Sequence, residues 1–258
     1  MKFMLKHIKH IALLALALFA MVSCADYLDT DKYFKDRMSV EKAFEQREYA
    51  ENWLAHAYFF LQNENADVCN KNYSWHNFAD DIYTGDWDEL YKKFKNGEYD
   101  EGSLQSSWSS CYKGIRQASE FINNIDINEE MMKEEIIDYK GQARFARAYF
   151  YWLLLRKYGP IPIIKNDDGM IDYTLPYNEI ALPRNRYDDC VEYIASELAQ
   201  AAKELVVDRE ALNIARPSRG AALSARAKVL LFAASPLVNG NNDDYAAQLV
   251  DDEGNRLL

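Results

Sequence analysis

The chain has 258 residues, 49% of them hydrophobic, and a formal net charge of −11 at pH 7. It is long enough to bury one substantial core or two modest ones. The acidic balance excludes a nucleic-acid-binding protein, because phosphate backbones require a basic surface, and it excludes electrostatic attachment to anionic lipid.

The N-terminal residues predict an export signal followed by a lipid anchor. Three lysines precede an unbroken apolar run from Ile11 to Val22, which is too short to span a membrane and typical of a secretory signal peptide. The run ends at Cys24 in a sequence that resembles the bacterial lipobox. We therefore expect removal of residues 1–23, lipidation of Cys24, a tether over 24–38 and a folded domain over 39–258. A plain cleaved signal with an incidental cysteine is the alternative.

Residue types that commonly carry chemistry are sparse in the rest of the chain. Cys69, Cys111 and Cys190 are odd in number and widely spaced, which excludes a disulfide framework and a zinc site but leaves their disulfide state open. The sequence contains no HExxH motif, no nucleophile elbow and no phosphate-binding glycine loop. It therefore predicts no metal, no cofactor and no catalytic residue.

Helices are predicted in chain order by apolar residues that recur every three or four positions. The first begins after Ser39, a good capping residue, and runs to about Leu61. Residues 63–103 lose this periodicity and are rich in Asn, Asp, Gly, Trp and Tyr. We expect a long loop there, of a kind that is often functional. The second helix covers about 104–125.

The third predicted helix is the most apolar element of the chain. It begins near Asn128, whose side chain can cap it, and continues to Gly159. Its apolar residues lie on all sides, which is typical of a helix buried between neighbours. Gly159 suits the left-handed conformation that closes many helices, and Pro160 prevents continuation.

Two arginines lie among the aromatic rings of this third helix. Arg144 and Arg147 are candidates for binding an anion. Buried arginines more often pair with an acid, and Glu120 or Glu192 would be suitable partners. We therefore interpret both arginines as structural.

The last two predicted helices follow an irregular connection over 159–185. The fourth has apolar residues at alternating steps of four and three, which predicts a narrow seam against a partner helix. These seam residues are Tyr187, Val191, Ile194, Leu198, Ala201 and Leu205. The fifth, over 218–235, is rich in alanine and should pack closely on its neighbours. Without convincing strand alternation, the pattern predicts an all-α fold of antiparallel helix pairs.

The third helix also carries a family signature. Residues 142–150, QARFARAYF, with Leu153 and the sequence YGPIP at 158–162, closely resemble the signature of the SusD/RagB family of Bacteroidetes outer-membrane lipoproteins. Further stretches fit in the same order along the chain. They are Cys24 to Asp29, Trp108 with Tyr112 and Ile115, residues 184–205, and residues 216–236.

The resemblance implies a fold and a function. The fold is a set of tetratricopeptide-like helix pairs with long irregular loops. The function is that of a lipoprotein, anchored in the outer membrane and facing the cell exterior, which binds a nutrient, usually a glycan. It would deliver this ligand to a SusC-like TonB-dependent transporter without catalysis. Because family members commonly run to about twice this length, we expect this chain to be the N-terminal part, with the C-terminal half missing.

Two other functions stay open. A helical scaffold could dock onto the transporter without a ligand site of its own. A secreted glycan hydrolase would need paired carboxylates, and Asp80 with Asp81 are the candidates. Adjacent acids on an irregular segment need not face one gap, so we favour the binding protein.

Candidate ligand-binding residues lie in the long loop. Sugars stack their C–H faces on aromatic rings, while amides and carboxylates bond the hydroxyl groups. Residues 72–91 supply both kinds of group. The candidates are Trp75, His76, Asn77, Asp80, Asp81, Tyr83 and Trp87. The alternative for Trp75 and Trp87 is that their rings pin the loop to the helices, and the resemblance does not fix which loop residues bind.

Overall fold

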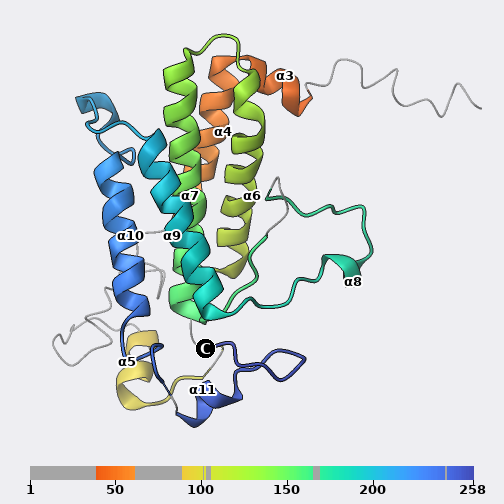
Figure 1. Cartoon of the computed structure of the whole chain (residues 1–258), viewed down its shortest axis with the longest axis vertical. Coiled ribbons are helices and arrows are strands. Elements are labelled where there is room, and N and C mark those ends of the chain that lie inside the picture. Colours follow the sequence, from red (N-terminus) through yellow and green to blue (C-terminus); the bar gives the residue numbers. More distant parts are fainter. Residues whose placement is uncertain (1–38, 62–88, 101, 103–105, 165–168, 242) are drawn as a thin grey trace, which may run out of the picture. The chain divides into compact units, whose positions relative to one another are not determined.

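The computed structural model shows a helical protein (Figure 1). It describes residues 39–61, 89–100, 102, 106–164, 169–241 and 243–258. By its internal contacts the chain divides into Met1–Lys42, of which only 39–42 are described, and Ala43–Leu258. Within the described ranges there is no strand, only an isolated antiparallel bridge between Val250 and Arg256. The prediction of an all-α fold is therefore confirmed.

The helices keep the labels of Figure 1. They are α3 (Val40–Glu45), α4 (Arg47–Phe59), α5 (Glu89–Asn96), α6 (Trp108–Asn124), α7 (Lys133–Tyr158), α8 (Tyr177–Ile180), α9 (Tyr187–Glu204), α10 (Arg219–Ala233) and α11 (Asp244–Gln248). The described residues also include short 3-10 helices at Ile125–Ile127 and Ala211–Asn213. None of the helices in these ranges combines the length and the apolarity that crossing a membrane requires.

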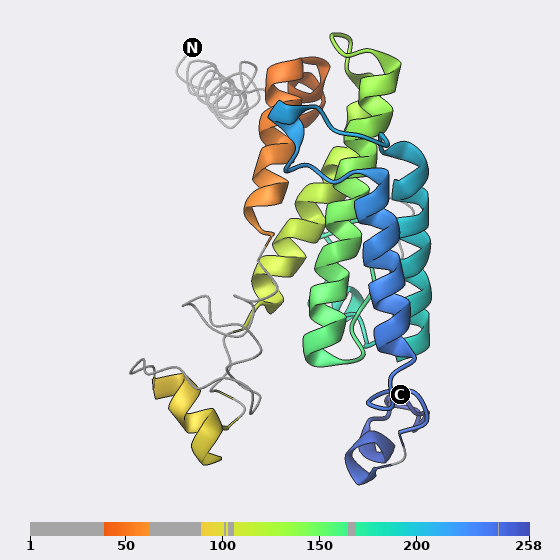
Figure 2. The ribbon, with the colours of Figure 1, turned by 90° about the vertical axis from the view of Figure 1, so that its left-hand side faces the viewer.

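The helix α7 lies at the centre of the bundle. It packs against α6 and α9, α9 packs against α10, and α4 packs against α6, so that neighbouring helices stand side by side (Figure 2). Five consecutive α7 residues, 150–154, are each no more than 1% exposed, as expected for a helix enclosed on all sides. Burying each of these side chains stabilises the fold by about 1.5–3 kcal/mol. The prediction of a buried central helix is confirmed.

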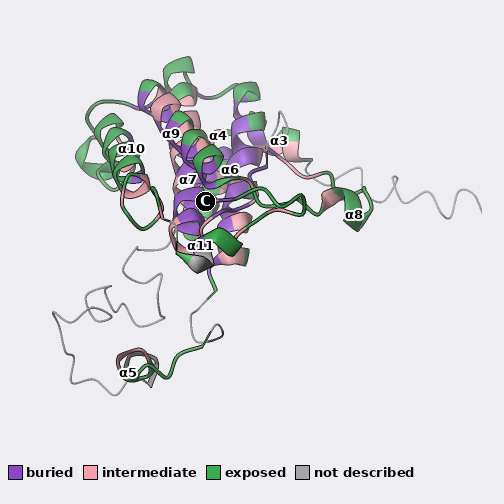
Figure 3. Ribbon diagram, turned by 60° about the horizontal axis from the view of Figure 1, so that its bottom comes forward, coloured by how far each residue is buried: buried purple, intermediate pink, exposed green. Residues whose placement is uncertain are grey.

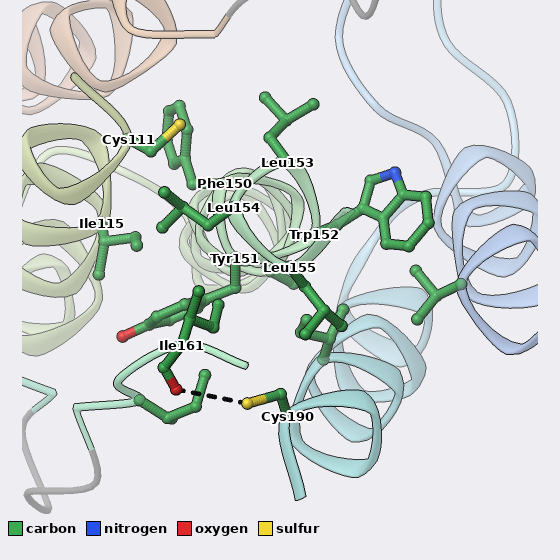
Figure 4. Packing of buried hydrophobic residues seen from close by; sticks show 14 of the residues in the cluster. Cys111, Ile115, Phe150, Tyr151, Trp152, Leu153, Leu154, Leu155, Ile161 and Cys190 are labelled. Carbon is green, nitrogen blue, oxygen red and sulfur yellow. Dashed lines mark hydrogen bonds between the residues drawn. The ribbon is translucent and has the colours of Figure 1, made fainter. Parts of the chain in front are cut away.

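The main buried cluster lies where α7 meets α6, α9 and the segment after Gly159. Figure 3 shows this part of the bundle as its most buried region, and Figure 4 shows the side chains that fill it. Phe150 faces α6, whereas Trp152 lies edge-on against Phe232 of α10, with ring centroids 5.2 Å apart. Cys111 and Cys190 are buried thiols, and Cys190 donates to the carbonyl oxygen of Ile161 at 3.4 Å.

The seam predicted for the fourth helix is also confirmed. Every one of its residues is at most 9% exposed. They belong to α9, apart from Leu205, which caps that helix. The seam packs α9 against both α7 and α10.

Three helix boundaries differ from the prediction for local reasons. The first helix is broken at Gln46 into α3 and α4, because the carboxylate of Glu130 accepts the Arg47 N–H at 2.7 Å and so caps a new helix. The start expected at Asn128 is too early. Its side-chain oxygen accepts the N–H groups of Glu130 and Met131, which closes a turn, and α7 begins only at Lys133.

The third difference is α5, which lies where a loop was predicted. Its sequence ELYKKFKN offers one apolar pair spaced by four, a pattern too short to signal a helix. Gly159 closes α7 with a positive φ of +68°, as expected, but its ψ of −139° lies outside the left-handed helical conformation.

The close packing expected for the fifth helix holds on one face only. Ser218 caps α10 by accepting the N–H of Ala221 at 3.4 Å. Ala222 and Val229 are buried towards α9, but Leu223 is 50% and Leu231 76% exposed. The alanines allow close approach to α9, but they do not by themselves enclose the helix.

An ionic network ties α7 to α9. Arg147 donates to Glu197 from two of its nitrogens and to the hydroxyl of Ser119 at 3.1 Å. Arg144 donates to Glu197 at 3.1 Å and to Glu204 at 2.9 Å. The structural interpretation of both arginines is confirmed, but the suggested partners Glu120 and Glu192 are wrong. The register between α7 and α9 selects the acids, and Glu192 lies on the exposed side of α9.

Candidate ligand-binding site

A surface cavity of about 290 Å³ lies between α6 and the connection from α7 to α9. This connection begins after α7 at Gly159 and ends at Arg186, just before α9 (Figure 1). It contains the short helix α8. The described residues that line the cavity are Trp108, Tyr112, Arg116, Pro162, Ile164, Gly169, Met170, Ile171, Tyr173, Ile180 and Leu182.

One wall of the cavity is a single face of α6. Trp108, Tyr112 and Arg116 are spaced by four residues, so their side chains align along the helix. The rings of Trp108 and Tyr112 have centroids 5.1 Å apart. The hydroxyl of Tyr112 donates to the carbonyl oxygen of Pro162 at 2.7 Å, which ties α6 to the opposite wall. Burial raises the pKa of Tyr112, so this hydroxyl remains a neutral donor at physiological pH.

The opposite wall is held by contacts between the two ends of the connection. The guanidinium of Arg184 donates to the carbonyl oxygens of Tyr158 and Pro160, at 3.2 and 2.6 Å. Asn185 donates its backbone N–H to the Ile161 carbonyl at 3.0 Å and accepts the Ile163 N–H on its side chain at 2.8 Å. These bonds supply partners for the extended backbone that follows Gly159, and they fix the start and end of the wall together.

The cavity touches the ionic network at Gly169. This buried residue has φ +66°, and a Cβ atom there would lie 2.9 Å from both Arg147 Nη1 and Ser119 Oγ. Only glycine allows the backbone to approach this closely in that conformation. The bond between Arg147 and Ser119 therefore supports the floor of the cavity.

The rim is formed by Tyr173, which is 59% exposed. Its backbone is shaped by a tight turn in which Asp172 accepts the N–H and the hydroxyl of Thr174, at 2.9 and 2.6 Å. These hydrogen bonds lower the pKa of Asp172, which keeps the carboxylate ionised. The guanidinium carbon of Arg116 lies over the Tyr173 ring at 5.0 Å from its centroid, a cation–π contact across the cavity mouth.

The lining suits a ligand that has both flat apolar faces and polar groups. Three aromatic rings supply surface for stacking, and Arg116 supplies hydrogen-bond donors. Among its described lining residues there is no carboxylate, histidine or thiol that could exchange protons with a ligand. In the ranges that the structure covers, no three His, Cys, Asp or Glu side chains gather to hold a metal ion.

A second cavity, of about 350 Å³, lies at the start of α7 and is lined by Glu134, Glu135, Asp138, Tyr139, Val206, Asp208, Arg209, Glu210 and Asn213. The buried acid of this cavity, Asp138, already has hydrogen-bond partners. Asp138 accepts two bonds from Arg209, at 2.6 and 2.9 Å, and a third from Gln142 at 2.8 Å. We interpret this cluster as structural support for the loop between α9 and α10.

The structure does not describe the residues that the sequence predicted to bind the ligand. Trp75, His76, Asn77, Asp80, Asp81, Tyr83 and Trp87 all lie outside the described residues, as do Cys24 and Cys69. Sequence reasoning missed the cavity, although the spacing of Trp108, Tyr112 and Arg116 was visible in the sequence. No local pattern indicated that Tyr173, far along the chain, would lie against Arg116.

Comparison with known proteins agrees with the fold. Residues 26–231 match the SusD-like family described as starch-binding and associating with the outer membrane. A SusD-like protein of Bacteroides ovatus is 28% identical over 191 residues, which cover 70% of this chain and 33% of that protein. The chain therefore spans about a third of this curated relative.

Solved structures give the same result. A SusD homologue from Bacteroides thetaiotaomicron aligns with a TM-score of 0.60 at 22% identity, over 80% of this chain and 40% of that one. Surface glycan-binding protein A from Bacteroides uniformis aligns with a TM-score of 0.55 at 19% identity, over 72% of this chain and 41% of that one. At this level of identity the likeness establishes the helical fold.

Proposed function

The chain belongs to the SusD-like family, and we propose that it is a non-catalytic surface lipoprotein that binds a glycan and delivers it to a SusC-like TonB-dependent transporter. Within this proposal, residues 1–23 are a signal peptide and Cys24 carries the lipid. The protein is anchored in the outer membrane and faces the cell exterior. Incorporation of labelled palmitate that is lost in Cys24→Ser tests the anchor.

The observation that carries the glycan-binding proposal is the ring-lined cavity on α6. Its three aromatic rings lie within one opening of about 290 Å³, which suits a short stretch of sugar residues. Aromatic rings bind sugars through the C–H groups on the flat face of the pyranose ring. The related solved structures include proteins named for glycan binding and for laminarin binding, which supports a sugar as the ligand class.

On the sequence argument, the segment from Trp75 to Trp87 is proposed as a second part of the site. It supplies further rings and carboxylates, and it joins the helices before and after it in the sequence. The Trp87→Ala variant should weaken glycan retention without unfolding the protein. Unchanged retention would remove Trp87 from the site.

Affinity electrophoresis of the full chain through gels that contain single polysaccharides tests the proposal. The panel consists of starch, laminarin, dextran, dextran sulfate and polygalacturonate. We expect Tyr173→Ala to reduce retention by the bound polysaccharide several-fold, because one stacking surface is lost. The matched control is Tyr177→Ala, which removes a ring that is 81% exposed on α8 and does not line the cavity.

Three results would contradict the proposal. Equal retention of the Tyr173→Ala and Tyr177→Ala variants would place the ligand elsewhere. No retention by any polysaccharide of the panel would favour a scaffold that contacts only the transporter. Release of reducing sugar from a retained polysaccharide would instead show a hydrolase.

A further inference from the structure

We infer that the ligand of the α6 cavity is an anionic glycan, which bears carboxylate or sulfate groups, and that Arg116 binds its negative charge. This inference rests on the proposed function and specifies the substrate class of the same site.

Arg116 is the one charged residue among the described residues that line the cavity. The protein as a whole carries a net charge of −11, so acids would be expected around an opening of this size. The described part of the lining instead combines apolar side chains, aromatic rings and one guanidinium. Arg116 itself is exposed, so a ligand in the cavity can reach its guanidinium. A neutral sugar needs only hydrogen-bonding groups, whereas a positive charge beside the ligand favours a ligand with a negative one.

Arg116 has no ion-pair partner among the described residues. Arg144 and Arg147 are bound to Glu197, and Arg184 donates to backbone carbonyl oxygens. The contact that the structure gives Arg116 is the one with the ring of Tyr173. A cation–π contact orients the guanidinium but uses none of its N–H donors.

The guanidinium therefore has the properties of a carboxylate or sulfate receptor. Its five N–H donors lie in one plane and match two oxygens of an anion at once. The rings of Trp108, Tyr112 and Tyr173 lie in the same opening, so one sugar residue could stack while its acidic group reaches Arg116. Hydrogen bonds that involve charged groups are about twice as strong as neutral ones, which makes this contact a determinant of specificity.

Two matched pairs of polysaccharides test the inference on the full chain. Polygalacturonate is compared with its carboxyl-reduced form, and dextran sulfate with dextran, so that carboxylate and sulfate are distinguished. We expect at least one anionic member to be retained more strongly than its neutral partner. The Arg116→Gln variant should weaken that retention roughly tenfold. The matched control is Lys113→Gln, which removes the same charge from an exposed position on α6 that does not line the cavity.

The outcomes separate this inference from the proposed function. Retention of neutral glycans that depends on Tyr173 but not on Arg116 would overturn the anionic ligand and leave a glycan-binding site. Equal losses in Arg116→Gln and Lys113→Gln would show a general charge effect and would also overturn it. No retention by any polysaccharide would overturn the proposed function itself.

Discussion

Replacing Gly114 with alanine tests the packing of α6 on α7. Gly114 is buried in the middle of α6, directly opposite the ring of Phe150. A Cβ atom at this position would lie 2.4 Å from Cζ of Phe150, and 2.5 and 2.8 Å from its two Cε atoms. Carbon atoms in favourable contact are about 3.5–4.0 Å apart, so the ring or the whole helix must shift by about 1 Å.

Two opposing effects decide the magnitude. Alanine is favoured over glycine inside a helix by about 0.8–1.0 kcal/mol. Overpacking a well-packed core costs about 1–3 kcal/mol, and Phe150 is 0% exposed, so its ring has little room to move. We therefore expect Gly114→Ala to lower the free energy of unfolding by about 1–2 kcal/mol. For a protein of this size, that lowers Tm by roughly 2–8 °C.

Urea denaturation followed by circular dichroism at 222 nm measures this change. Gly220→Ala is the control, because Gly220 lies on exposed α10 and its nearest neighbour would be 3.8 Å away. It should keep or raise the stability. Gly114→Ala combined with Phe150→Leu should lose less than the sum of the two single variants, since each relieves the crowding of the other. A Gly114→Ala variant as stable as the original chain would refute the close approach of α6 and α7.

The remaining predictions concern buried polar groups. Glu197→Gln should lower the free energy of unfolding by about 2–4 kcal/mol in thermal denaturation, because Arg144 and Arg147 lose their shared carboxylate. The control Glu192→Gln makes the same charge change at an exposed position and should shift the free energy of unfolding by less than about 0.5 kcal/mol. Equal losses of stability in the two variants would argue against the ionic network. The Tyr187 hydroxyl is buried without a hydrogen-bond partner among the described residues, so Tyr187→Phe should not destabilise the fold at neutral pH. Burial raises the pKa of Tyr187 to about 12, whereas an unfolded tyrosine titrates near about 10. The stabilisation that the neutral Tyr187 hydroxyl gives to the folded state is therefore complete below pH 10 and is lost as pH rises towards 12. Tyr187→Phe should flatten that part of the profile of unfolding free energy against pH.

The sequence by itself determined the helices and much of their burial. Apolar spacing is a local property, and a residue's position on a helix follows from the chain's own geometry. The seam of α9 and the enclosed residues of α7 were therefore predicted correctly, as was the positive φ of Gly159. The family signature of residues 142–162 begins in this same central helix and ends in the segment that follows Gly159.

The boundaries and partners depended on contacts from elsewhere in the chain. Asn128 closes a turn instead of starting α7, and Glu130 caps α4, a helix more than eighty positions earlier in the chain. Likewise, Glu197 rather than Glu192 binds Arg147 because of the register between α7 and α9. A sequence lists the available acids but does not fix which of them a given helix face will meet.

The candidate site shows the same division between sequence and structure. A spacing of four residues puts Trp108, Tyr112 and Arg116 on one face of α6, but this spacing does not say what lies opposite that face. The tertiary structure decided this, since Gly159, Arg184 and Asn185 fold the connection back against α6 and bring Tyr173 over Arg116. A cavity is made by two surfaces that are distant in sequence, and only their packing creates it.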